Sequence, residues 1–345
     1  MSSGDLVVRL LTPGDRERWD AFVRVCPDAT FFHLSAWAEL LEEQLGHRAW
    51  YFYAERGGDI VAVLPLAQVR SLLFGHALVS LPFCAYGGIA GDAAAAPLLE
   101  ARADELAAEL GVEYLELRNL SLRHEDWPRQ TLYATFRKEI LPDDEANLNA
   151  IPRKQRAMVR KGIKHGLCAE IDEDVTRFFR LYSDNVRRHG TPALPRRFFA
   201  ALRERFGDDC EILTVTAPDG RPLSSVLSFY FRDEVLPYYA GDHVDARRVA
   251  ANDFKYWALM THARARGCTV FDYGRSKAGT GPWSFKKNWG FEPHTLSYEY
   301  RLYKREAVPQ NNPLNPKYAA FIAIWKRLPL PVANLLGPPI ARHLG

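Results

Sequence analysis

Hydrophobic residues recur along this chain in two patterns, one with a helical period and one typical of strands. The clearest helical pattern has residues spaced by three and four on one face, at Phe254, Trp257, Ala258 and Thr261. Asn252 or Asp253 can cap this helix, and Gly267 fits the left-handed residue that ends one. Residues 268–273 are short, β-branched and aromatic. This segment therefore predicts a helix that leads into a buried strand.

The same order of elements occurs in both halves of the chain. In the first half we predict strands at 6–11, 49–55, 60–69, 112–117 and 131–141, with helices after Ser35 and over 93–110. In the second half we predict helices at 176–188 and 252–267, with strands at 211–216, 223–231, 235–240, 268–273 and 295–303. Such a repeat of element order predicts an α/β fold with two domains of mixed sheets. Their expected bounds are 1–145 and 146–305.

A C-terminal tail, 306–345, falls outside this repeat. Tyr318, Phe321, Ile322, Trp325 and Leu328 form an apolar stripe beside Lys317, Lys326 and Arg327. Such a stripe can lie on an anionic membrane surface, which would suit a lipid-linked substrate, or it can dock against the protein. We expect docking across the first domain. No apolar run approaches the ~20 residues that a membrane-spanning helix needs.

Composition limits the classes of protein. The formal net charge of +3 is small, so no global basic field indicates DNA binding. The five cysteines are scattered and form no Cys-x-x-Cys pair, which argues against a disulfide framework or structural zinc and favours a reducing compartment. The N-terminus shows no secretory signal. We therefore expect a cytoplasmic protein that binds no metal. Its tail can bring the protein to the inner face of the membrane.

Polar side chains gather where the strand at 268–273 ends. They are Asp272, Tyr273, Arg275 and Ser276. In open α/β sheets ligands bind at the carboxyl ends of strands. Gly279 and Gly281 then allow backbone N–H groups to approach an anion closely. Residues 285–289 add two lysines in an aromatic setting, so this region is the main candidate site.

At this strand end the chain resembles a known family. Three segments carry the resemblance: Phe-Asp-Tyr-Gly-Arg-Ser at 271–276, Gly-Thr-Gly at 279–281 and Phe-Lys-Lys-Asn-Trp-Gly-Phe at 285–291. Together they are similar to the second domain of FemAB-like proteins, and more narrowly to the branch associated with bacterial exosortase and exopolysaccharide systems. The resemblance extends from about Phe31 to Tyr303. It implies two tandem GNAT-like acyl-CoA N-acyltransferase domains; the best-known members add amino acids from aminoacyl-tRNA to peptidoglycan precursors.

Two residues are candidates for catalysis. The resemblance maps Lys286 onto the family's Phe-Lys lysine at the substrate site, where it can hold a phosphate or stabilise negative charge. Asp272 can take a proton from the acceptor amine, or it can bond to backbone or to Arg275 instead. A surface role for Lys286 predicts that Lys286→Ala preserves folding and abolishes transfer. If that variant unfolds, Lys286 is structural.

Other candidates for substrate binding lie at strand ends and in loops: Tyr86, Tyr239, Asp242, His243, Tyr273, Arg275, Ser276 and Lys287. For several of them a structural role stays open. Asp242 and His243 fit a polar loop equally well, Tyr273 fits core packing, and Arg275 fits a salt bridge. Tyr86 precedes two glycines, so it lines the site from the first domain or belongs to a turn.

A basic run lies where the two domains join. Its phosphate-binding candidates are Arg153, Lys154, Arg156, Arg160 and Lys164, with Lys161 and no acid among them. Helical spacing places most of them on one stripe, and this charge density suits a phosphate-bearing donor. Tandem FemAB-like proteins also carry a basic helix here. A solvated helix face is the alternative.

The donor is left open by the sequence. Ordinary GNAT enzymes bind the coenzyme A diphosphate with a glycine-rich loop at a helix start, and residues 241–252 lack that pattern. The donor is therefore an acyl-CoA bound in another way, an aminoacyl-tRNA or another activated acyl group, with no tightly bound cofactor. No nucleophile or metalloprotease signature is present. Amine acyl transfer needs none, because alignment and oxyanion stabilisation supply much of the rate.

These observations predict an N-acyltransferase that moves an acyl or aminoacyl group onto an amine of a cell-envelope or exopolysaccharide precursor. An aminoacyl-tRNA-dependent ligase of the peptidoglycan type is the alternative within this class. A catalytically silent GNAT-like module of a polysaccharide or exosortase system is the alternative outside it. The charged residues Asp272, Arg275 and Lys286 favour an enzyme. The missing glycine pattern favours the silent module or an unusual donor.

Overall fold

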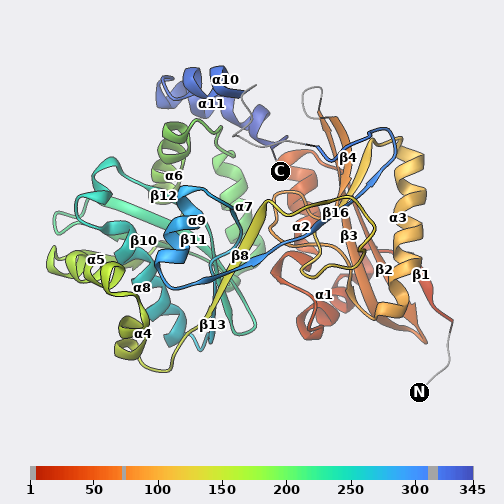
Figure 1. Cartoon of the computed structure of the whole chain (residues 1–345), viewed down its shortest axis with the longest axis horizontal. Helices are drawn as coiled ribbons and strands as arrows, with labels where there is room; N and C mark the ends of the chain where they lie inside the picture. The colour runs from red at the N-terminus through yellow and green to blue at the C-terminus, as the bar shows by residue number, and fades with distance from the viewer. Residues whose placement is uncertain (1–4, 72–74, 310–317, 345) are drawn as a thin grey trace. The chain divides into compact units, whose positions relative to one another are not determined.

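The computed structural model describes residues 5–71, 75–309 and 318–344, which form two compact units (Figure 1). The first unit is built from residues up to 133, from 295–309 and from 342–344, and the second from 134–294 and 318–341. Each unit has its own eight-stranded mixed sheet with helices packed on it. The prediction of two α/β units with mixed sheets is confirmed.

The first sheet has the strand order β1-β2-β3-β4-β6-β16-β7, with β5 beside β3. Its strands are β1 Val7–Leu10, β2 Ala49–Arg56, β3 Asp59–Ser71, β4 Gly75–Val79, β5 Ala90–Gly91, β6 Tyr114–Leu117, β7 Arg129–Gln130 and β16 Tyr298–Leu302. Its helices are α1 Arg16–Val25, α2 Ala36–Glu39 and α3 Ala96–Leu110. Helix α3 buries Leu99, Leu106 and three of its alanines against β2 and β6. It ends at Gly111, whose φ of 64° is the left-handed conformation that glycine adopts readily.

The second sheet has the order β14-β8-β13-β12-β11-β10-β9, with β15 beside β8. Its strands are β8 Tyr133–Glu139, β9 Cys168–Ile171, β10 Cys210–Thr216, β11 Pro222–Phe231, β12 Glu234–Asp242, β13 Val270–Asp272, β14 Ser276–Lys277 and β15 Glu292–Thr295. Its helices are α4 Asp144–Ala150, α5 Arg153–Lys164, α6 Thr176–His189, α7 Arg196–Phe206, α8 Ala251–Ala265, α9 Gly281–Asn288, α10 Ala319–Trp325 and α11 Leu330–Ala341.

Strand β11 lies at the centre of the second unit. It is buried along almost its whole length because helices cover both faces of the sheet. Helix α8 packs Leu259 and Met260 against core residues of β10 and β11, and α6 contacts β11 and β12. At Gly241 on β12 the approach of α6 is close: an added Cβ atom would lie 2.3 Å from the backbone nitrogen of Tyr182.

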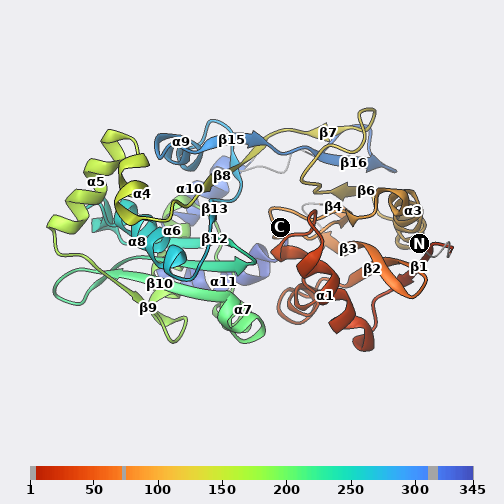
Figure 2. The ribbon, with the colours of Figure 1, turned by 90° about the horizontal axis from the view of Figure 1, so that it is seen from below.

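Two strands lie in a different sheet from the one that chain order predicts. The strand expected at 131–141 in the first domain is β8, which pairs with β13 in the second sheet. The strand expected at 295–303 in the second domain is β16, which pairs with β6 and β7 in the first sheet (Figure 2). Neither unit is therefore a continuous segment, and the expected boundaries near 145 and 305 do not separate the two sheets.

The tail also differs from its expected position. Helices α10 and α11 pack against α6 of the second unit, as Figure 1 shows, whereas docking across the first domain was expected. Arg187 of α6 donates to the carbonyl oxygens of Lys326 (3.0 Å) and Leu328 (3.2 Å) between these helices. Lys317 of the expected stripe lies outside the described residues. In the described parts of the chain, no helix has the length and apolar character that a membrane crossing requires.

Candidate functional site

Strands β12 and β13 lie side by side only at the beginning of β12, because β13 is three residues long. They run parallel, and the pairs Glu234–Val270 and Val235–Phe271 are their whole register. Strand β12 continues to Asp242 with a bulge at Tyr238 opposite β11. Beyond Val235, no described residue of β13 pairs with β12. This open edge of β12 can offer backbone N–H and C=O groups to a ligand.

The end of β13 is held by Lys286 of α9. Its Nζ donates to the carbonyl oxygens of Tyr273 (2.6 Å), Gly274 (2.9 Å) and Arg275 (3.2 Å). An ammonium group has three donors, so all of them are used within the protein. The residue is 8% exposed, and burial lowers the pKa of Lys286 to about 7, while the Asp272 carboxylate acts in the opposite direction. Lys286 is thus a buried lysine that fixes the strand end.

Asp272 is buried at the same strand end, with 1% of its surface exposed. Its Oδ1 accepts from the backbone N–H of Gly274 at 2.8 Å and from the hydroxyl of Thr135 at 3.3 Å. These contacts match the structural alternative, a carboxylate bonded to backbone. Its predicted role as proton acceptor stays a prediction.

The end of β12 carries a second buried charge. Lys255 of α8 is fully buried, and its Nζ lies 3.1 Å from Oδ1 of Asp242, which also accepts from the hydroxyl of Ser224. Burial lowers the pKa of Lys255, but Asp242, Tyr256 and Asp253 together outweigh it, so the pKa lies above its usual value. Motif analysis missed Lys255. Its spacing of four residues from Ala251 and from Leu259, both buried in α8, could have indicated that Lys255 is buried.

Aromatic rings join the two strand ends. The ring centroids of Tyr256 and Tyr273 are 4.6 Å apart, and Tyr256 lies 6.5 Å from Trp289. The indole of Trp289 donates to Oδ1 of Asp253 at 3.0 Å. Burial raises the pKa values of Asp253 and of both tyrosines. The site is therefore a cluster of charged and aromatic groups, and several of these groups have pKa values shifted from their usual values.

Other predicted residues surround this cluster. Ser276 is buried in β14, and Arg275 contributes its carbonyl oxygen to Lys286. Lys287 is exposed, with its Nζ 4.8 Å from the ring centre of Trp283. His243 begins a short turn, where its Nδ1 accepts from the backbone N–H of Asp245 at 3.2 Å.

Two predicted residues lie elsewhere. Tyr239 packs in an aromatic cluster with residues of α6 and α7, and its ring lies 5.2 Å from that of Phe199. Tyr86 belongs to the first unit, where it is 1% exposed and its ring lies 5.9 Å from that of Phe32. Because the ring of Tyr86 is almost completely buried, it offers no surface to a substrate, contrary to expectation.

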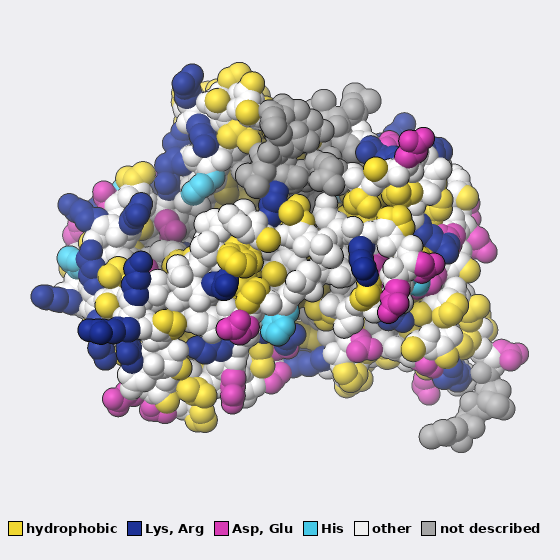
Figure 3. All heavy atoms as spheres, viewed as in Figure 1, with side chains coloured by type: hydrophobic (Ala, Val, Ile, Leu, Met, Phe, Trp, Pro, Cys, Tyr) yellow, Lys and Arg dark blue, Asp and Glu magenta, His cyan; other side chains and the backbone are white. Residues whose placement is uncertain are grey.

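The basic run forms helix α5, as predicted. Four of its candidates are exposed: Arg153, Lys154, Arg160 and Lys164. Arg156 is half-buried and donates to the side-chain oxygen of Asn149 at 3.0 Å. No acidic residue occurs in α5. Figure 3 shows Lys and Arg side chains gathered over the end of the second unit where Figure 1 places this helix.

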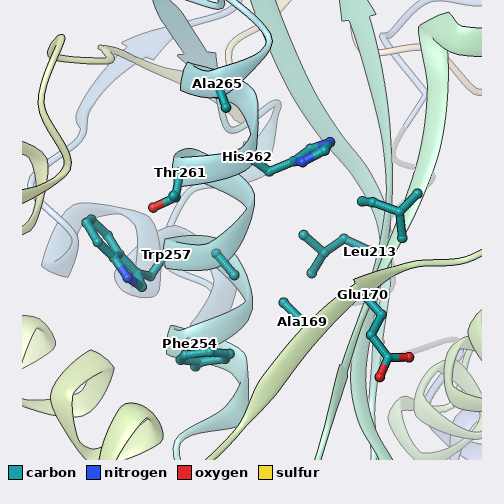
Figure 4. Close-up of a pocket in the computed structure, with 10 residues that line it drawn as sticks. Ala169, Glu170, Leu213, Phe254, Trp257, Thr261, His262 and Ala265 are labelled. Carbon is teal, nitrogen blue, oxygen red and sulfur yellow. The ribbon is translucent and has the colours of Figure 1, made fainter.

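A groove of about 400 Å³ lies between α8 and the strands β9 and β10 (Figure 4). The predicted helix face lines it, with Phe254, Trp257, Ala258 and Thr261. These residues are only partly buried, and the buried face of α8 consists instead of Ala251, Lys255, Leu259, Met260 and Ala263. None of the predicted catalytic or binding residues lines the groove. In the described parts of the chain, no cluster of three or more His, Cys, Asp or Glu could hold a metal ion.

Comparisons with known proteins show which fold this chain shares. Residues 148–287 match the family model of an acetyltransferase (GNAT) domain. No curated protein matches the sequence. The solved structure of FemX is similar with a TM-score of 0.68 at 16% identity, covering 86% of this chain and 98% of that one.

Two further solved structures share the fold. That of L-PGS from Bacillus licheniformis has a TM-score of 0.58 at 14% identity, covering 98% of this chain and 99% of that one. A tandem GNAT protein from the clavulanic acid biosynthesis pathway has a TM-score of 0.53 at 12% identity, covering 86% and 98%. The chain therefore has a tandem GNAT-like fold, and its residues 148–287 are similar to a GNAT acetyltransferase domain.

Proposed function

We propose that this chain is an N-acyltransferase that moves an acyl or aminoacyl group onto an amine of a cell-envelope or exopolysaccharide precursor. One observation carries the proposal: β12 pairs with β13 only as far as Val235, and near the end of each strand a buried lysine interacts electrostatically with a carboxylate. Both strand ends lie within the GNAT-type residues 148–287. In this proposal the enzyme works in the cytoplasm, where activated acyl donors are made.

The open edge of β12 is the proposed place of the reacting carbonyl group. Its backbone N–H groups can donate to the carbonyl oxygen as that oxygen becomes negatively charged during attack. Lys286 acts as a positioning residue, because its three contacts fix the backbone of residues 273–275 at the end of β13. This role replaces the direct contact with a substrate phosphate that the motif suggests.

The acceptor amine must lose a proton as its nitrogen bonds to the carbonyl carbon. The bond from that carbon to the donor then breaks, and the donor leaves as the tRNA ribose hydroxyl or, for an acyl-CoA, as the thiol of coenzyme A. We assign proton acceptance to Asp242, whose side chain is 31% exposed. Asp272 is 1% exposed, and backbone and hydroxyl groups already donate to it. Lys255 orients Asp242 from below the surface, since its Nζ lies 3.1 Å from the carboxylate.

The donor is proposed to carry several phosphates. Helix α5 presents five exposed basic side chains and no acid, which suits an aminoacyl-tRNA or the phosphates of an acyl-CoA. The turn before α8 has no glycine, and Ala250 takes a φ of 57° there. A bulkier loop at the helix start argues against the usual diphosphate site. This observation favours the tRNA-dependent alternative over coenzyme A.

Native mass spectrometry can identify the donor by the complex that it forms with the protein. Acetyl-CoA, a long-chain acyl-CoA and aminoacyl-tRNA are each tested separately. A transfer assay then follows the label from the bound donor to amine-bearing envelope precursors. We expect one donor to bind and to transfer, with turnover lost in Asp242→Asn and kept in Arg129→Gln, a change at an exposed residue of the first unit. Donor binding without transfer to any amine would support the silent module. Absence of binding by all three donors would overturn the proposal.

A further inference from the structure

Helix α11 buries its small residues and exposes its large ones. Ala333, Gly337 and Ala341 are buried. The opposite face carries Val332, Leu335 and Leu336, which are 39%, 76% and 48% exposed. A helix that only stabilises a fold places its large apolar residues inside. In α11 the side chains whose burial would contribute most to the stability of the fold are exposed to solvent.

Close contacts fix this orientation. An added Cβ atom at Gly337 would lie 3.1 Å from the carbonyl oxygen of Ala193, so α11 approaches the backbone there and a larger residue would push against it. The side-chain amide of Asn334 also donates to the hydroxyl of Ser183 at 3.4 Å. Rotation of α11 to bury Leu335 would break both contacts. The contacts of Gly337 and Asn334 therefore keep the leucines of α11 on the exposed side of the helix.

Helix α10 extends the same apolar surface. Trp325 is buried, and the ring of Phe321 stacks on it with a centroid distance of 5.2 Å. Phe321 and Ile324 remain 38% and 62% exposed. Figure 3 shows hydrophobic side chains gathered over α10 and α11. We call the exposed set Phe321, Ile324, Val332, Leu335 and Leu336 the apolar tail face.

The charges beside this face have one sign. Between Tyr318 and Ala341 the chain contains no Asp or Glu, and its two charged residues, Lys326 and Arg327, are exposed between the helices. On the neighbouring α6, Arg187 and Arg188 both contact the carboxylate of Asp184 and neutralise it. Exposed hydrophobic residues with adjacent basic residues match the interface of an anionic lipid bilayer.

We propose that the apolar tail face is a docking surface for an anionic membrane. The hydrophobic side chains enter the boundary between headgroups and acyl chains, and Lys326 and Arg327 contact lipid phosphates. The helices lie on the membrane and do not cross it. The inference is independent of the proposed acyl transfer, because it concerns binding of the chain to lipid.

Vesicle flotation with the purified full-length chain tests this surface. We expect binding to vesicles of phosphatidylcholine mixed with phosphatidylglycerol, and much weaker binding to phosphatidylcholine alone. Leu335→Glu/Leu336→Glu should weaken binding at least about tenfold. Leu98→Glu is the matched control, since Leu98 of α3 is also an exposed leucine, 42% exposed, and it should bind like the wild type.

A second variant separates charge from hydrophobic insertion and guards against misfolding. Lys326→Gln/Arg327→Gln keeps the apolar face and should weaken binding roughly tenfold at low salt, with the circular dichroism spectrum unchanged. Failure of the wild type to bind anionic vesicles would overturn the proposal. A dimer in analytical ultracentrifugation that Leu335→Glu/Leu336→Glu dissociates would also overturn it, because a second copy would then cover the face.

Discussion

The Nζ atom of Lys286 lies 2.6 Å from the carbonyl oxygen of Tyr273, a residue 13 positions earlier in the chain. This hydrogen bond ties helix α9 to the end of β13. It explains the position of a lysine directly after Phe285, since the side chain must reach back from the helix to the strand end. The lysine is therefore part of the scaffold of the site.

Loss of the Lys286 amine should destabilise the fold. Lys286→Met keeps most of the side-chain length but removes the amine that donates to three backbone carbonyl groups. We expect a loss of about 2–3 kcal/mol in the free energy of unfolding, measured with urea. Lys287→Met is the control, and it should change stability by no more than about 0.5 kcal/mol. A stable but inactive Lys286→Met would instead support direct contact with the substrate.

Lys286 should also make the free energy of unfolding depend on pH. The folded pKa of Lys286 is about 7 and the usual value is 10.5, so between these values the unfolded chain binds more protons than the folded one. The free energy of unfolding should therefore rise with pH over this window, by up to about 1.4 kcal/mol per pH unit, and fall as pH drops toward 7. The difference between wild type and Lys286→Met in urea titrations at several pH values measures this contribution. A difference independent of pH would show that the carbonyl groups keep the amine charged.

The pair Asp242–Lys255 should respond asymmetrically to mutation. Asp242→Ala leaves the fully buried ammonium of Lys255 without its carboxylate, which we expect to cost about 3 kcal/mol. Lys255→Met leaves Asp242, whose side chain is 31% exposed and open to water, so about 1 kcal/mol is expected. Thermal or urea unfolding of both variants compares them. Equal losses would mean that Lys255 reaches solvent when unpaired.

Much of this architecture follows from local patterns. The helix ending at Gly267, the hairpins and the basic helix α5 were predictable because each depends on neighbouring residues. The sheet to which β8 and β16 belong was not, since strand pairing is decided by partners far along the chain. Buried Tyr298 and Tyr300 of β16 are compatible with either sheet as far as the sequence shows.

The site was predictable only in part. The motif located Asp272, Tyr273 and Lys286 at one strand end, where the structure places them. It presented Lys286 as a surface residue, because lysines are rarely buried. Lys255 was missed for the same reason, although it lies in an apolar row of α8.

The contact between β12 and α6 gives a prediction about the scaffold. In Gly241→Ala the new methyl group would lie 2.3 Å from a backbone nitrogen of α6, so the helix must move. We expect a loss of about 3 kcal/mol in unfolding free energy, together with reduced activity because Asp242 is the next residue. Gly281→Ala is the control, since nothing lies within 4 Å of its added Cβ atom. Equal stability of the two variants would contradict this packing.

Helix α5 should bind the donor through charge. Arg160→Glu/Lys164→Glu reverses two exposed charges on one side of the helix. Counterion release makes phosphate binding depend on salt, so the variant should bind aminoacyl-tRNA at least about tenfold more weakly at low salt and show a smaller salt dependence. Fluorescence anisotropy at low and high salt measures both effects, with urea unfolding to show that stability is kept.

A matched charge reversal outside α5 completes that test. Arg129→Glu changes an exposed arginine in the first unit and should leave tRNA affinity near that of the wild type. If Arg129→Glu weakens binding as much as the α5 variant, the attraction comes from net charge and α5 has no special role. If neither variant changes affinity while transfer persists, the donor lies elsewhere and α5 is a solvated helix face.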